Sequence, residues 1–478
     1  MPVIVVLFFA LHVVVRLLLS GNLEVDEAQF VGRTGFQLGF PGSHPPLYEW
    51  LITLVHWASG GLWVLPVALV KNAFLAGHYL LAWDMARRLR GSALAGLMAA
   101  CALVFLPQVV WMGQVTLAHS VAVGFAVLAT LHALSLWLMR PSVPRALWLA
   151  IAITIGALVK YNFLLFLVAL AAAVFSLPAI RMRLDRVSGT LAVGVTALLI
   201  GPHAIWALAN LSLTTERVAK LYSERNAISP IDVPFLGVDG IVSFMAALAA
   251  WGAPLALVWW LGWRAARPRV AAEPVRGGWD FADDFATLCG RTALIGAGVF
   301  ALFVLFGDVR TVHERYLTPI LMPAVIWAVL RYPLERRPAV AGIVAMLASS
   351  LLVIAMVAVI AVATLGPSRL AYPYAGIADD IAGANVEPLA ILANRHDLAA
   401  NVVLRMPDGV LWSSGTERDV VLIWRRGDRV PPHLEAQVSA THRQLSDVRS
   451  HYHLYDNLSA RTVTLYSARF TPIAPVQD

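Results

Sequence analysis

Long apolar runs separated by short polar segments fill the first 365 positions of the chain. A transmembrane helix needs roughly 20 mostly apolar residues, and eleven segments are candidates. They cover residues 2–20, 62–84, 93–111, 115–138, 146–159, 163–179, 188–209, 240–263, 291–307, 317–330 and 339–365. The first segment lacks a basic start and a small-residue cleavage site, so we interpret it as a retained helix. The pattern predicts an all-α polytopic membrane domain over residues 1–366.

The pattern changes after residue 366, where Pro and Gly interrupt short apolar runs. Residues 389–392, 402–404, 420–424 and 462–466 are typical of short strands, and residues 377–384 and 434–440 are typical of helices. We therefore predict a small α/β domain over residues 367–478. No catalytic motif is evident in its sequence.

The composition supports a membrane protein. Hydrophobic residues make up 59% of the 478 residues and charged residues 14%, whereas soluble domains have about 45–50% and about 25%. This composition excludes a soluble globular protein. It also excludes intrinsic disorder, which needs low hydrophobicity and high charge.

The net charge of +7 is unevenly distributed, because the residues after 370 hold ten Arg against twelve Asp and Glu. Basic residues concentrate in alternate loops, at 87–90, 140–145, 181–186, 264–276 and 331–337. This distribution argues against a nucleic-acid partner, and the positive-inside rule predicts that these loops and the N-terminus are cytoplasmic. We expect a bacterial inner-membrane protein whose C-terminal domain and loops 21–61, 160–162, 210–239 and 308–316 are periplasmic.

The first outer loop places three carboxylates at the edge of the membrane. Glu24, Asp26 and Glu27 follow the first apolar segment directly, and Gln29, two positions later, is a candidate for positioning the acceptor or the donor. A carboxylate that is desolvated on one side can have a shifted pKa, which suits general-base work. The alternative is that Asp26 and Glu27 only cap a short helix.

Three aromatic or imidazole rings are candidates for positioning a donor or an acceptor. His44 and Tyr48 flank the rigid Pro45-Pro46 pair in the same outer loop, and His119 lies near the outer start of the segment 115–138. For His119 the alternative is an ordinary buried histidine of a helix bundle.

Two basic clusters are candidates for binding a lipid phosphate. Lys160 and Tyr161 lie between two apolar segments, where an ionisable residue is a functional candidate by default. His313 and Arg315 lie in the outer loop 308–316, and a guanidinium can fork onto phosphate oxygens. Lys71 falls inside an apolar segment. The alternatives are snorkelling for the two lysines and, for the loop, solvated residues with Glu314 and Arg315 ion-paired elsewhere.

Other site classes find no support in the sequence. The cysteines Cys101 and Cys289 form neither a disulfide framework nor a metal motif. No Asp-x-Asp, P-loop, dinucleotide fingerprint, zinc motif or G-x-S-x-G occurs. We therefore expect no cofactor and no metal site, although a divalent ion is compatible with the chemistry.

Four features recur together and in order: Asp26-Glu27, His44-Pro45-Pro46-Leu47, the Lys160-Tyr161 turn after Gly156, and the segment from Glu314 to Pro319. In this combination the chain resembles the bacterial branch of the protein O-mannosyltransferase superfamily. That branch includes the lipid A aminoarabinose transferases and the rhizobial lipid A galacturonosyl transferases. The resemblance covers roughly residues 20–325, so the tail lies outside it.

The resemblance implies a glycosyltransferase with a GT-C fold that takes a sugar from a polyprenyl-phosphate carrier, such as undecaprenyl phosphate. The acceptor is a hydroxyl on lipid A, another glycan, a lipid or a protein. It implies that Asp26 is the general base, that Glu27 orients Asp26 or the acceptor, and that Lys160 and Arg315 bind the carrier phosphate. From the chemistry we expect a single inverting displacement. We expect the loop 210–239, with Arg217, Lys220 and Arg225, to act as a cover.

The chain departs from its relatives in two places. Relatives often have an Asp where this chain has Ala118-His119, and the aminoarabinose transferases have an Arg where it has Gln29. These departures argue against aminoarabinose as the donor sugar. Two alternatives stay open: a secondary transporter, and an inactive relative that acts as a lipid-binding scaffold.

Overall fold

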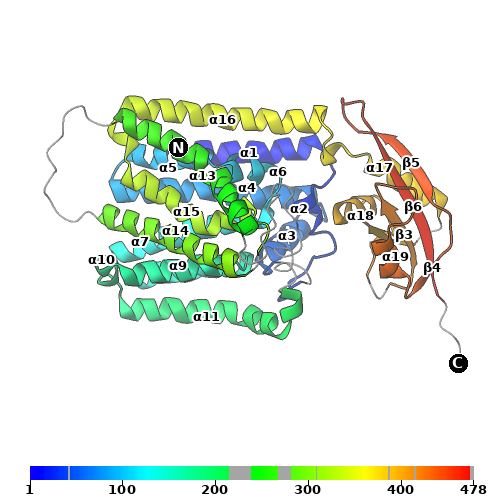
Figure 1. The fold of residues 1–478 in the computed structure, drawn as a ribbon, viewed down its shortest axis with the longest axis horizontal. Helices are drawn as coiled ribbons and strands as arrows, with labels where there is room; N and C mark the ends of the chain where they lie inside the picture. The colour runs from blue at the N-terminus through cyan, green and yellow to red at the C-terminus, as the bar shows by residue number, and fades with distance from the viewer. Residues whose placement is uncertain are drawn as a thin grey trace. The chain divides into compact units, whose positions relative to one another are not determined.

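A computed structural model describes residues 1–40, 44–214, 238–266, 281–307, 309–385, 388–413 and 416–473. Helices dominate up to residue 384, and within the described residues all strands follow residue 388 (Figure 1). Most of the loop 210–239 that we expect to act as a cover lies outside the described residues, with its basic residues Arg217, Lys220 and Arg225.

Eight helices in the described part of the chain are long and apolar enough to cross a membrane. They are α1 (Pro2–Leu19), α4 (Val64–Arg90), α7 (Ala118–Met139), α11 (Arg186–Ala209), α13 (Val238–Ala266), α14 (Phe281–Phe306), α15 (Glu314–Arg331) and α16 (Pro338–Leu365). A further apolar segment bends by 77° between α5 (Ala93–Val104) and the pair η1 (Gln108–Met112) and α6 (Gly113–Val115).

Two shorter apolar helices, α8 (Val143–Val159) and α9 (Phe163–Ser176), complete the set. With the bent segment and the eight long helices, they correspond one by one to the eleven segments that we predict from the sequence. The other helices given for the described residues before α16 are short: α2 (Val25–Ala28), α3 (Leu47–Ala58), α10 (Pro178–Arg181) and the 3-10 turn η2 (Leu334–Arg336). The predicted fold class is confirmed.

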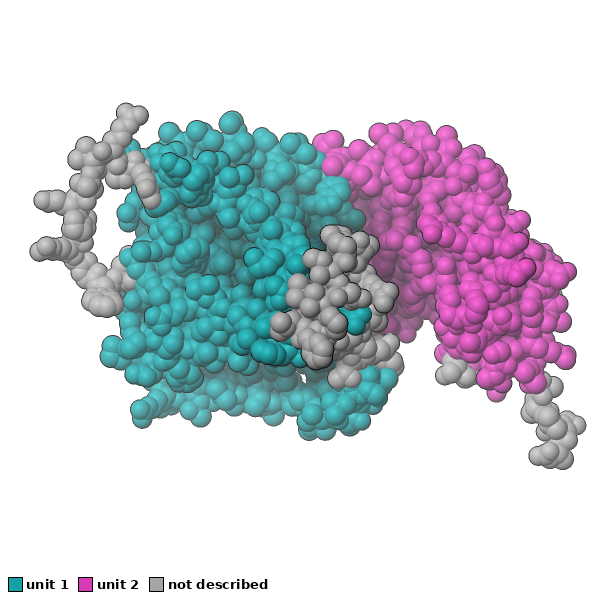
Figure 2. All heavy atoms as spheres, viewed as in Figure 1, with its two compact units in different colours: residues 1–12, 35–53, 69–355 teal, residues 13–34, 54–68, 356–478 magenta. Residues whose placement is uncertain are grey.

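The chain forms two compact units, which Figure 2 colours separately. Unit 1 contains residues 1–12, 35–53 and 69–355, and unit 2 contains residues 13–34, 54–68 and 356–478. The division runs through α1, α3, α4 and α16, so each of these helices belongs to both units. The predicted domain boundary between residues 366 and 367 stays a prediction.

The core of unit 1 is built around α7, which packs against α8 and α15. The membrane-length window of α7 is 83% buried, as expected of a helix that is apolar on all sides. At the end of α8, the ring of Phe163 comes within 2.3 Å of the place that a Cβ on Gly156 would take. Only a residue without a side chain fits there, so Gly156 lets the Lys160 turn fold tightly back onto α8.

Unit 2 holds a six-stranded sheet of β1 (Leu389–Ala393), β2 (Val410–Leu411), β3 (Asp419–Trp424), β4 (His442–Gln444), β5 (Arg449–Leu454) and β6 (Thr462–Pro472). The strand order is β2-β1-β3-β6-β4, and β5 also pairs with β6. The strands β2, β1 and β3 run parallel, whereas β6 is antiparallel to β3, β4 and β5.

Alternate residues of the central strands face two separate cores. Leu389, Ile391, Val421 and Ile423 pack against α17 (Tyr374–Ala384) and α18 (His396–Val403). Their neighbours, among them Ala390, Val420 and Leu422, pack against α19 (Pro432–Val438). Both faces of the sheet are therefore covered by helices, as is usual for strands that pair in parallel. The 3-10 turn η3 (Arg369–Ala371) precedes this domain.

One strand prediction is wrong, because residues 402–404 lie at the end of α18 and beside it rather than in a strand. All residues of this helix from Asp397 to Val402 are buried, and Leu398, Ala399 and Val402 belong to the core against the sheet. Three apolar residues are too few to distinguish a period of two from one of 3.6. The sequence pattern also does not reveal β2, β4 and β5, which are short or polar.

Candidate active site

A cluster of rings gathers around His119 in unit 1. The ring of His44 lies 4.3 Å from that of His119, and the ring of Tyr48 lies 4.9 Å from it, measured between centroids. The structure therefore brings together the three rings that the sequence predicts for positioning a substrate. His119 is buried, and a cluster of imidazole and phenol groups of this kind can donate and accept hydrogen bonds.

Glu49 belongs to the same cluster, although we do not single it out from the sequence. It is 1% exposed, and its Oε1 lies 3.5 Å from Nε2 of His119. A carboxylate on the first turn of an apolar helix is a signal that sequence reasoning can use, because burial of a carboxylate is costly without a partner. Glu49 is therefore a further candidate for orienting His119.

The residue before α7 has an unusual backbone conformation. Leu117 precedes the helix with φ +65° and ψ +35°, in the left-handed region that bulky side chains avoid. Such a conformation costs of order 1–3 kcal/mol and persists only where the surroundings enforce it, often at functional sites.

Lys160 lies beside this cluster. It is 6% exposed, and its Nζ donates a hydrogen bond of 2.7 Å to Oγ of Ser120, the neighbour of His119. A buried lysine does not snorkel to the surface, so the alternative that we raise from the sequence does not hold for Lys160. Its ammonium is held inside the helix bundle, as an anion-binding role requires.

Tyr161 and Asn162 continue the turn and tie it to its neighbours. Burial and the charge on Glu49 raise the pKa of the Tyr161 phenol, so this hydroxyl keeps its proton. Its ring stacks on His203 at 5.9 Å. Nδ2 of Asn162 donates a hydrogen bond of 3.1 Å to the main-chain oxygen of Tyr316. The turn therefore contacts the start of α15.

The start of α15 carries the two other predicted phosphate ligands. His313 is the N-cap residue of α15, and its ring contacts that of Tyr316 at 5.5 Å. The guanidinium of Arg315 lies over the Tyr316 ring at 5.5 Å. Within the described ranges, neither Glu314 nor Arg315 has an ion pair. The half-buried Arg315 still has its fork of donors available for a phosphate.

Lys71 is buried in α4, and its Nζ donates a hydrogen bond of 2.9 Å to the main-chain oxygen of Gln114 in α6. The alternative of a snorkelling side chain therefore does not hold for Lys71 either. Its predicted contribution to the phosphate site stays a prediction.

Asp26, Glu27 and Gln29 belong to unit 2, where α2 carries the first two. Glu27 is buried, and it forms a capping box with Glu24 that fixes the start of α2. Its Oε2 also lies 2.6 Å from Nη2 of Arg16. Glu27 therefore caps α2, as the alternative expects, and its predicted role in orienting Asp26 or the acceptor stays a prediction. Gln29 donates a hydrogen bond of 2.8 Å to the main-chain oxygen of Asp26.

The α2 segment is fastened to the C-terminal sheet domain within unit 2. The buried side chain of Asn401 accepts a hydrogen bond from the amide of Leu23 and donates one to its oxygen, at 2.8 and 2.9 Å. Nδ2 of Asn22 donates to the main-chain oxygens of Leu370 and Tyr372. His396 contacts the oxygen of Ala28 at 3.1 Å. The domain whose role the sequence leaves open therefore holds the helix that carries Asp26.

The structure thus brings His44, Tyr48, His119, Lys160 and Tyr161 together in unit 1, with the Arg315 segment against them. The convergence of Asp26 with these residues stays a prediction. Within the described ranges, no group of three or more His, Cys, Asp or Glu side chains is arranged to hold a metal ion.

Comparisons with known proteins agree with these features. Residues 43–206 match the family described as dolichyl-phosphate-mannose-protein mannosyltransferase. The chain is 27% identical to the lipopolysaccharide core galacturonosyltransferases RgtA and RgtB of Rhizobium johnstonii, over 87% of this chain and 85% of each relative.

The fold is similar to that of ArnT from Cupriavidus metallidurans, whose crystal structures are known bound to undecaprenyl phosphate and in the apo state. The TM-scores are 0.58 and 0.59, the identities 15% and 14%, and the match covers 97% of both chains. The predicted resemblance, the GT-C fold and the glycosyltransferase class are confirmed.

Proposed function

We propose that this membrane glycosyltransferase of the GT-C type moves a sugar from a polyprenyl-phosphate donor to a hydroxyl of a lipopolysaccharide glycan. The observation that carries the proposal is the hydrogen bond from Asn162 to Tyr316. It links the turn of Lys160 and Tyr161 to the segment of His313 and Arg315, so the cationic groups for a donor phosphate come from adjoining elements of unit 1.

The relatives support the two substrate classes. Undecaprenyl phosphate is bound in one ArnT structure that shares the fold, which supports a polyprenyl-phosphate carrier. The two galacturonosyltransferases act on the lipopolysaccharide core, which supports a glycan acceptor and makes galacturonate the first donor sugar to test. With these substrates the reaction takes place at the periplasmic face of a bacterial inner membrane, with the N-terminus in the cytoplasm.

The chemistry is a single displacement at the anomeric carbon. The acceptor oxygen forms a bond to this carbon while the bond to the carrier phosphate breaks, so the configuration inverts. Asp26 takes the proton of the acceptor hydroxyl as general base. Lys160 and Arg315 stabilise the charge on the leaving polyprenyl phosphate, with the protonated phenol of Tyr161 as a further donor.

The histidine cluster serves substrate positioning. His44, Tyr48 and His119 offer ring faces and hydrogen-bonding atoms to a sugar, and Glu49 orients His119 through its contact of 3.5 Å. Relatives often have an Asp where this chain has Ala118-His119. We propose that the Glu49–His119 pair supplies a carboxylate to this region from another helix.

The test compares the wild type with Asp26→Asn, both purified in detergent and matched in thermal unfolding. Each is incubated with lipopolysaccharide and a panel of polyprenyl-phosphate sugars, and released polyprenyl phosphate is measured. General-base catalysis contributes about 10²–10⁴-fold, so we expect at least a hundredfold loss in the variant. The control is Asp408→Asn, at an exposed carboxylate of unit 2, which should keep full activity.

Equal release by the wild type and Asp26→Asn removes Asp26 as the base. No release by the wild type with any donor and acceptor contradicts the proposed function, and favours the inactive relative or the transporter.

A further inference from the structure

We propose that a pocket in unit 2, lined by Arg369, Arg425, Tyr372 and Tyr455, binds an acidic sugar of the acceptor glycan through its carboxylate or phosphate group. This inference rests on the proposed function, because it names the chemical class of the acceptor. It assigns a binding role to the C-terminal domain, which the sequence leaves without one.

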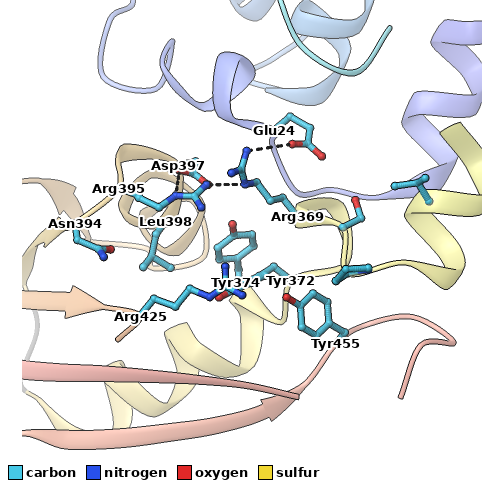
Figure 3. A pocket seen from close by; sticks show the side chains of 13 residues that line it. Glu24, Arg369, Tyr372, Tyr374, Asn394, Arg395, Asp397, Leu398, Arg425 and Tyr455 are labelled. Carbon is cyan, nitrogen blue, oxygen red and sulfur yellow. Dashed lines mark hydrogen bonds and ion pairs between the residues drawn. The ribbon is translucent and has the colours of Figure 1, made fainter. Parts of the chain in front are cut away.

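The pocket is built from segments far apart in the sequence (Figure 3). Glu24 comes from the first loop, Arg369 from the turn after α16, Arg395 from the start of α18 and Arg425 from the residue after β3. Its volume is about 360 Å³, near the small end of the range of roughly 300–1,000 Å³ for ligand pockets. It therefore suits one sugar with its charged substituent better than an extended chain.

The charges on the lining favour an anion. Three guanidinium groups face two carboxylates, so one positive charge is left over. The buried Asp397 is held in a bidentate fork by Arg395, and Nε of Arg369 lies 3.6 Å from its Oδ2. Arg369 also lies 4.0 Å from Glu24. Both carboxylates are thus already engaged with Arg395 and Arg369.

Arg425 supplies the excess charge. Among the described residues it has no carboxylate partner, and its guanidinium lies over the ring of Tyr372 at 5.7 Å. Its exposed side chain lines the pocket. A structural ion-pair network explains Arg395 and Asp397, because a buried carboxylate needs a partner. It does not explain an arginine at the same pocket that neutralises nothing.

Aromatic rings give the pocket a face for a sugar ring. Tyr372 lies 5.1 Å from Tyr374 and 5.3 Å from Tyr455 between ring centroids, so the three rings form one continuous group. Pockets for small ligands commonly combine such aromatic walls with a few placed charges. The rings can pack on the apolar face of a pyranose while a guanidinium forks onto its acidic substituent.

The place of the pocket along the chain fits a membrane-anchored acceptor. Val362, in the last turn of α16, and Pro367, just beyond that helix, are part of the lining. α16 is the last helix long enough to cross a membrane. The pocket therefore lies where the chain leaves this apolar helix, a place that suits the proposed contact with the first sugars of a lipid-anchored glycan.

The test measures binding of small probes to the full chain in detergent, without a donor. Glucose 6-phosphate and glucuronate carry the proposed chemistry, glucose lacks the charge, and inorganic phosphate lacks the sugar. We expect both acidic sugars to bind at least about tenfold more tightly than glucose or phosphate, since one hydrogen bond to a charged group is worth about 1.5–3 kcal/mol. Titration calorimetry or saturation-transfer NMR gives the comparison.

Arg425→Gln should weaken binding of the acidic sugars about tenfold and leave the fold intact, because no buried carboxylate loses its partner. Arg426→Gln is the matched control, since this neighbour is exposed and does not line the pocket. Arg369→Gln should act like Arg425→Gln, because Asp397 keeps its fork with Arg395. Equal effects of the substitutions at 425 and 426, or equal binding of glucose and glucuronate, overturn the proposal. The proposal is also overturned if phosphatidylglycerol nanodiscs bind tightly and displace the acidic sugars, because the positive charge of the pocket would then bind lipid headgroups.

The two proposals fail separately. If the wild type binds acidic sugars through Arg425 but releases no carrier phosphate, the proposal for the pocket stands and the proposed function is contradicted. If the wild type transfers sugar, and Arg425→Gln keeps both its affinity for the acidic probes and its KM for the acceptor, only the proposal for the pocket is contradicted.

Discussion

The polar clusters of the two units differ in the kind of charge that they carry. In unit 1 the cluster around His119 consists of histidine, lysine, tyrosine and a carboxylate, all of which can exchange protons or bind a compact anion. In unit 2 the pocket relies on arginines, which stay charged at any relevant pH and present fixed forks. The comparison teaches that the residue types of unit 1 suit the proposed binding of the donor phosphate, whereas those of the unit 2 pocket suit the proposed recognition of an acidic sugar.

The largest expected effect tests the chemical side of this comparison. Lys160→Gln removes the buried cation beside Ser120 and should lower the rate of sugar transfer about 10²–10³-fold, as loss of one electrostatic donor does in other enzymes. The measurement is polyprenyl-phosphate release at saturating donor. Arg291→Gln, at an exposed cation of unit 1, should change little. A rate for Lys160→Gln within a few-fold of the wild type would mean that Lys160 does not stabilise the leaving phosphate.

The next prediction concerns Glu27, which we assign to structure although it adjoins the proposed base. Arg16→Met leaves the Glu27 carboxylate buried without its partner at 2.6 Å, which should cost about 3 kcal/mol of stability. The double variant Arg16→Met with Glu27→Gln should recover part of the loss, because the buried charge is gone. Thermal unfolding in detergent measures both. If Glu27→Gln alone abolishes transfer without lowering stability, Glu27 acts in the chemistry.

The smallest effect lies at the surface of the sheet domain and depends on pH. Partial burial opposes ionisation of Asp380, but hydrogen bonds from His453 and His451, at 2.9 and 3.1 Å, outweigh it and lower the pKa of this carboxyl. The resulting stability is present above the ordinary value of 3.8 and is lost as the pH falls through the lowered pKa.

Because the Asp380 carboxylate is exposed, the two contacts together contribute about 0.5–1 kcal/mol. We expect Asp380→Asn to lower the unfolding midpoint slightly at pH 7 and to match the wild type at pH 2. A difference that persists unchanged at pH 2 would assign the effect to packing.

The periodicity of apolar residues was sufficient to predict the membrane helices, because each is a local pattern of about 20 residues. The same reasoning singled out Lys160 and His119 as polar residues in apolar surroundings, and both are buried; their roles stay predictions. It misplaced residues 402–404, where a short apolar run is compatible with a strand or a helix. It also passed over Glu49, a single carboxylate whose importance depends on the contact with His119 in another helix.

The sequence alone determined the fold class, because the membrane helices follow from local hydrophobicity. The resemblance of its ordered motifs to a known superfamily indicated the glycosyltransferase class, and the roles of the candidate residues stay predictions. Only the tertiary structure decided how the C-terminal domain is used. Asn401 bonds to Leu23 across 378 positions of the chain, and Glu24 shares a pocket with Arg369 and Arg425. Such pairings have no local signature, because their energy arises only when distant segments have already been brought together by the packing of helices and strands.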